Sequence, residues 1–130
     1  MIAAPFDRVV TSPPYANRVS CMLELRPRMY WQEFLVNGRD AGELSWLAIG
    51  GTWGIATSRL GDWEPQATRI RRDLERTLAN LGSPNNANGP LLATCIRKHC
   101  VDIAVHFHEL RAILAPGGST DIVGRSDHRR

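Results

Sequence analysis

A short apolar run that ends in a proline pair is the feature that most constrains this chain. Residues 7–11 read Asp-Arg-Val-Val-Thr, and residues 12–15 read Ser-Pro-Pro-Tyr. β-branched residues favour a strand, whereas neither proline has a backbone N–H with which to continue strand pairing. The pattern predicts a buried strand that ends in a rigid turn, with Ser12 and Tyr15 displayed at its tip. Ligands in open α/β sheets bind at this end of the strands.

Length and composition point to a single soluble unit. The chain has 130 residues, of which 43% are hydrophobic and 22% are charged. These values are ordinary for a globular domain and argue against a disordered or fibrous chain. The net charge of +3 suits an acidic partner such as DNA, although a basic surface that serves solubility explains it equally well.

The three cysteines give no metal or disulfide pattern. Cys21, Cys95 and Cys100 form no C-x-x-C pair, and no secretory segment opens the chain, so we expect reduced thiols in a cytoplasmic protein. A zinc site built from Cys95, His99, Cys100 and His106 is the alternative, but the paired-ligand spacing of structural zinc sites is missing, and we predict no metal. No apolar run reaches the roughly 18 residues of a membrane span, so no membrane association is expected.

Helical patterns follow the first strand. We expect helices over 17–26 and 28–36, separated at Pro27, then a turn at Asn37-Gly38 and a polar loop over 39–43. A helix over 65–80, a connection over 82–90 and a long helix over 91–114 come next. The Pro-Gly-Gly at 116–118 ends that helix, and residues 120–124 are predicted to form a second strand.

Two other features leave alternatives open. The segment 44–63 holds three of the four Trp residues, and it either enters DNA, with Arg59 near a phosphate, or packs onto the domain, which we favour slightly. The arginines of the 65–80 helix either form a phosphate-binding ridge or lie on a solvated face with interleaved acids, and the second is favoured. His106 and His108 point to different helix faces, so we do not expect them to act together.

The stretch from Thr11 to Tyr15, followed by Asn17 and Arg18, resembles the catalytic motif of DNA methyltransferases that methylate cytosine N4 or adenine N6 with S-adenosylmethionine. The Ser-led form is similar to the cytosine-N4 branch. The resemblance implies that Ser12, Pro13, Pro14 and Tyr15 are catalytic, and that Asn17 and Arg18 assist substrate binding.

The chemistry explains why these residue types belong together. An exocyclic base amine is a poor nucleophile because its lone pair is delocalised into the ring. Carbonyl oxygens of Ser12 and Pro13 can accept its two hydrogens without a competing proline N–H, and the Ser12 hydroxyl adds an acceptor. Tyr15 would stack on a base that has left the duplex.

The resemblance covers most of the chain but omits the cofactor motif. Residues 114–118 and the strand after them resemble the segment that leads into the fifth strand of the Rossmann-like methyltransferase fold, whereas Gly124-Arg125-Ser126 departs from the family's Gly-Asn-Ser-like sequence. No Gly-rich S-adenosylmethionine motif is present, so the cofactor-binding residues are unknown. We therefore expect an α/β, Rossmann-like partial catalytic domain over residues 1–130. It is a fragment, a split subunit completed by a second chain that carries the cofactor half, or a decayed copy. The alternatives are a non-catalytic DNA-binding or assembly module, and a methyltransferase acting on RNA or protein.

Overall fold

The computed structural model describes residues 5–16, 21–52, 58–65, 72–83 and 88–124. Its main elements are β1 (Phe6–Thr11), α1 (Cys21–Trp31), α2 (Gly38–Leu47), α4 (Arg72–Leu81), α5 (Gly89–Ile113) and β2 (Leu114–Ile122). The chain is therefore a small mixed α/β protein, which confirms the coarse prediction of fold class. Its Rossmann-like form stays a prediction, because the described sheet has only two strands.

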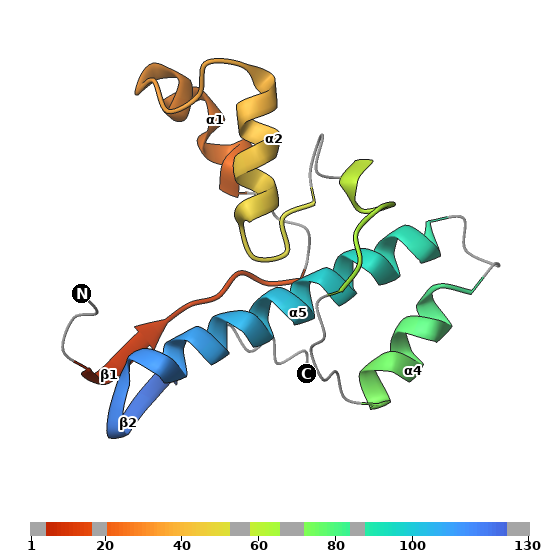
Figure 1. Ribbon diagram of the computed structural model, residues 1–130. Coiled ribbons are helices and arrows are strands. Elements are labelled where there is room, and N and C mark those ends of the chain that lie inside the picture. The colour runs from red at the N-terminus through yellow and green to blue at the C-terminus, as the bar shows by residue number, and fades with distance from the viewer. Residues whose placement is uncertain (1–4, 17–20, 53–57, 66–71, 84–87, 125–130) are drawn as a thin grey trace, which may run out of the picture.

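The long helix α5 is the element around which the others are arranged (Figure 1). At 25 residues it spans about 37 Å. The strand pair lies at its C-terminal end, α4 lies beside its N-terminal half, and α1 and α2 form a pair on the opposite side from α4 (Figure 1). None of the helices in the described ranges is both long and apolar enough for a membrane crossing.

The two strands are parallel, as expected for strands separated by helices. Val9 lies opposite Thr120 and Thr11 lies opposite Ile122, with an irregularity in register between Phe6 and Arg8. Arg8 also pairs with Asp121 across the strands. The predicted strand over 7–11 is confirmed in position, but it is not buried: the Val10 side chain is 65% exposed. The second strand begins earlier than predicted, because Pro116 and Gly117 lie within β2.

The region after β1 folds differently from the prediction. Pro27 lies inside α1 instead of separating two helices. The Asn37-Gly38 pair begins a helix instead of ending one, and the predicted loop over 39–43 is helical. The reason is a capping box: Asn37 Oδ1 accepts from the Asp40 N–H at 3.2 Å, and Asp40 Oδ2 accepts from the Asn37 N–H at 3.0 Å.

Helices α4 and α5 pack against each other and supply much of the small core. Leu78 of α4 is buried, as the predicted helical stripe requires, although the first part of that predicted helix, residues 66–71, lies outside the described residues. The Arg97 guanidinium binds Glu75 through two hydrogen bonds of 2.6 Å, which lowers the pKa of Glu75. On α5 the most buried positions include Cys95, Lys98 and Val101, and the lysine among them was not foreseen.

Candidate functional site

The predicted catalytic turn begins where β1 ends. The backbone N–H of Val123 donates to the Thr11 carbonyl at 2.9 Å, so the segment after β2 fixes the point at which the turn departs. Ser12 and Pro14 are exposed, Pro13 is half-buried, and the Tyr15 side chain is 51% exposed. The predicted rigid turn is not observed: Ser12–Tyr15 is irregular backbone that follows the carboxyl end of the parallel pair.

The motif predicts that the backbone carbonyls of Ser12 and Pro13 act as acceptors. No described residue donates a hydrogen bond to the carbonyl oxygen of Ser12 or of Pro13. Proline at positions 13 and 14 removes the local donors that would otherwise compete for these oxygens. Asn17 and Arg18, the predicted substrate-binding residues, lie outside the described residues.

A histidine that the sequence analysis considered only as a ligand of the disfavoured zinc site lies beside this segment. His106 of α5 places Nε2 3.4 Å from Thr11 Oγ1, across 95 positions of sequence. His108 is exposed, so the two histidines do lie on different faces, as predicted. No local pattern marks His106, because its proximity to Thr11 depends on how α5 packs beside β1.

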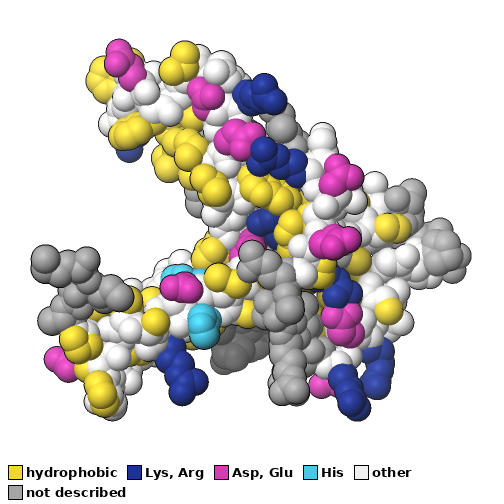
Figure 2. Space-filling view, in the orientation of Figure 1, with side chains coloured by type: hydrophobic (Ala, Val, Ile, Leu, Met, Phe, Trp, Pro, Cys, Tyr) yellow, Lys and Arg dark blue, Asp and Glu magenta, His cyan; other side chains and the backbone are white. Residues whose placement is uncertain are grey.

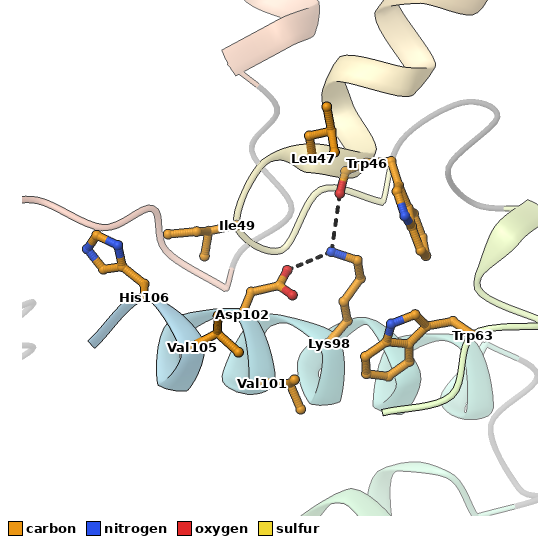
Figure 3. A pocket seen from close by; sticks show the side chains of 9 residues that line it. All are labelled: Trp46, Leu47, Ile49, Trp63, Lys98, Val101, Asp102, Val105 and His106. Carbon is orange, nitrogen blue, oxygen red and sulfur yellow. Dashed lines mark hydrogen bonds and ion pairs between the residues drawn. The ribbon is translucent and has the colours of Figure 1, made fainter. Parts of the chain in front are cut away.

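A cavity of about 310 Å³ opens next to His106 (Figure 3). It runs along α5, and its walls come from α2, the segment after α2, Trp63 and one face of α5 (Figure 3). The lining residues are Trp46, Leu47, Ile49, Trp63, Lys98, Val101, Asp102, Val105 and His106. Those from α5 are three or four positions apart or adjacent, so they share one face of the helix.

A buried ion pair crosses the middle of this cavity. The Lys98 side chain is 4% exposed, and its Nζ lies 2.6 Å from Asp102 Oδ2. Nζ also donates to the Trp46 carbonyl at 3.5 Å and lies 4.8 Å from the centre of the Trp46 ring. The same Asp102 oxygen accepts the Gly50 N–H at 2.8 Å, so the carboxylate is held from two sides.

The tryptophan-rich segment contributes packing in the part that is described. Trp46 contacts Lys98, and Arg59 lies 5.8 Å from its ring centre. Arg59 is also paired with Glu43 at 2.8 Å, so this arginine is already matched by an acid. The packing interpretation is therefore confirmed for Trp46, whereas Trp53 lies outside the described residues.

The alternative zinc ligands do not assemble. Among the described residues, no group of three or more His, Cys, Asp or Glu side chains could hold a metal ion. Cys95 and Cys100 are free thiols, and burial raises the pKa of Cys100. Burial also lowers the pKa of His99, which favours its neutral form.

Comparison with protein-family models, with curated proteins and with solved structures found no match to this chain.

Proposed function

We propose that this chain supplies the catalytic turn of an S-adenosylmethionine-dependent DNA methyltransferase that acts on an exocyclic base amine, with cytosine N4 as the favoured target. The observation that carries the proposal is the position of the Ser12–Tyr15 segment. It follows directly on β1 at the carboxyl end of a parallel strand pair, with Ser12, Pro14 and Tyr15 exposed.

The turn has the groups that amine activation needs. The carbonyl oxygens of Ser12 and Pro13 would accept the two amine hydrogens and draw the lone pair back onto nitrogen. Tyr15 would stack on the extruded base, an interaction worth about 1–3 kcal/mol. No strong general base is required, because the proton can leave after the methyl group arrives.

The sequence carries no Gly-rich motif like the one that binds S-adenosylmethionine in the family. The first strand leads into a proline pair instead of a Gly-rich loop, and no Gly-rich loop follows the second strand within the described residues. The proposal therefore places cofactor binding outside the described residues, such as on a second chain, and assigns to Ser12–Tyr15 the positioning and activation of the base.

The surface of the protein supports a partner of this kind. Parallel sheets are normally covered on both faces and rarely stop at two strands, yet Val10, Ile122 and Val123 are largely exposed. Figure 2 also shows hydrophobic side chains over α1 and α2, along the hollow that separates this pair from the strands.

Base analysis of DNA tests the proposal. We would express the chain with its native partner genes and measure N4-methylcytosine and N6-methyladenine by mass spectrometry. Tyr15→Ala should lower the methylated fraction at least tenfold. The matched control for Ser12→Ala is Ser119→Ala, at an exposed position on β2. This control should leave the methylated fraction unchanged.

Three outcomes would overturn this assignment. Full methylation by the Tyr15→Ala protein would remove the turn from the site. Salt-dependent DNA binding without methyl transfer, unaffected by Ser12→Ala, would identify the non-catalytic DNA-binding or assembly module. Methyl groups found in RNA or protein instead of DNA would assign a different substrate.

A further inference from the structure

We propose that the connection between α1 and α2 is the surface through which two copies of this chain form a two-fold symmetric dimer. This connection lies at the end of the helix pair farthest from α5 (Figure 1). Trp31 and Val36 are each 85% exposed there, and Phe34 is 69% exposed. These three residues are called the α1–α2 patch. The dimer does not depend on methyl transfer or on the cavity along α5.

The backbone holds the α1–α2 patch in one shape. Leu35, between two of the exposed residues, is only 2% exposed and anchors the segment. The Phe34 N–H donates to a carbonyl of α1 at 2.9 Å, and the Val36 N–H donates to Asp40 Oδ2 of α2 at 2.9 Å. Glu33 has a φ of 61°, in the left-handed region that non-glycine residues adopt infrequently. Apolar side chains on a fixed backbone need little ordering when they bind a partner.

The exposed area matches what a dimer contact of standard size needs. At these exposures Trp31 and Phe34 present about 300 Å² between them, and Val36 adds roughly 100 Å². A standard interface buries about 800 Å² on each partner, of which roughly 60% is apolar. The α1–α2 patch therefore supplies most of the apolar area that each copy would bury, and exposed patches of this size are often interaction sites.

The charges beside the α1–α2 patch favour a second copy over a partner of one sign. Arg28, Glu33 and Arg39 are exposed, and none of them forms an ion pair with another described residue. Figure 2 shows acidic and basic side chains beside hydrophobic ones at this end of the molecule. A two-fold axis places the same surface of both copies together, so an acid of one copy can face a base of the other. A strongly acidic or strongly basic partner would be repelled by one of the two signs.

Sedimentation velocity of the purified chain tests the dimer. As the concentration rises through the micromolar range, a species of 14.5 kDa should give way to one of twice that mass. Trp31→Ser changes an exposed side chain, so its circular dichroism should be native, and it should weaken dimerisation by at least about tenfold. Ile122→Ser, at a 57% exposed position on β2, is the matched control and should sediment like the wild type.

Glu33→Arg tests the match of charge. It leaves only basic side chains beside the α1–α2 patch, so dimerisation should weaken at low salt and partly recover at high salt, because salt screens exposed charges. A dimer that Glu33→Arg leaves unchanged or strengthens would contradict the self-complementary surface.

Three further results would overturn the dimer. A folded chain that stays monomeric at every concentration would assign the α1–α2 patch to a different protein. A Trp31→Ser dimer as tight as the wild type would exclude the patch from the contact. Dissociation caused by Ile122→Ser would move the contact to the strand pair.

Discussion

The sharpest test of the packing concerns the ion pair between Lys98 and Asp102. Asp102→Asn removes one charge and leaves the other in a site where Lys98 is only 3% exposed. Breaking a buried pair in this way typically costs about 3–5 kcal/mol. We expect about 3 kcal/mol, at the lower end of that range, because Asp102 is 24% exposed and the asparagine oxygen can keep the Gly50 hydrogen bond.

Urea unfolding followed by far-UV circular dichroism measures this loss. With a slope of about 2 kcal/mol per molar urea, the midpoint should fall by roughly 1.5 M. Glu43→Gln is the matched control, because the Arg59–Glu43 pair is 43% and 44% exposed and should cost less than about 1 kcal/mol.

A double variant identifies the cause of the loss. Lys98→Met combined with Asp102→Asn removes both charges, so most of the stability lost in Asp102→Asn should return. A midpoint shift no larger than that of Glu43→Gln would refute the idea that Lys98 is truly desolvated. A double variant as unstable as Asp102→Asn alone would show that the lost carboxylate, not the isolated ammonium, is the cause.

Two further predictions concern the loop after α2 and the contact between α4 and α5. A Cβ on Gly51 would overlap the Ser45 carbonyl oxygen, so Gly51→Ala should cost about 3 kcal/mol in urea unfolding. Gly61→Ala, whose nearest contact is 3.8 Å, should be nearly neutral, and an equal loss in both would contradict the steric explanation. The hydrogen bonds from α5 lower the pKa of Glu75 from 4.5, so their stabilisation is present at neutral pH and is lost as the pH falls below about 4.5. The urea midpoint of Glu75→Gln should therefore fall less steeply on acidification than that of the wild type, and parallel pH profiles would count against this.

Local sequence predicted the position of β1 and the long helix α5 well, because those elements depend on nearby residues. The rigid turn predicted after β1 is not observed, since Ser12–Tyr15 is irregular backbone. The β-branched run and the proline pair specify where β1 ends whatever lies around it. The exposure of Val10 could not be predicted in the same way, since burial of a strand depends on what covers it. An apolar run is consistent with a strand that is buried within its own chain, and equally with a strand that is covered only when a partner binds.

Ambiguous residue types account for the errors between α1 and α2. Asn followed by Gly is common both in turns and at helix N-caps, and only the reciprocal bonds between Asn37 and Asp40 decide between them. The burial of Lys98 was missed for a related reason. A lysine in a helix is normally assigned to the solvent face, and its burial here depends on Asp102 one turn later and on Trp46 from a different helix.

Helix α5 connects the turn and the cavity. Its C-terminal end continues directly into β2, and the residue after β2 binds the Thr11 carbonyl, while His106 on the same helix reaches the Thr11 hydroxyl. One turn earlier, Asp102 is held by Lys98 and by Gly50. Each residue of helix rotates the side-chain directions by about 100°, so a one-residue change in the register of α5 would separate both sets of contacts together. The packing of this single helix therefore determines the start of the Ser12–Tyr15 turn and the shape of the cavity beside it.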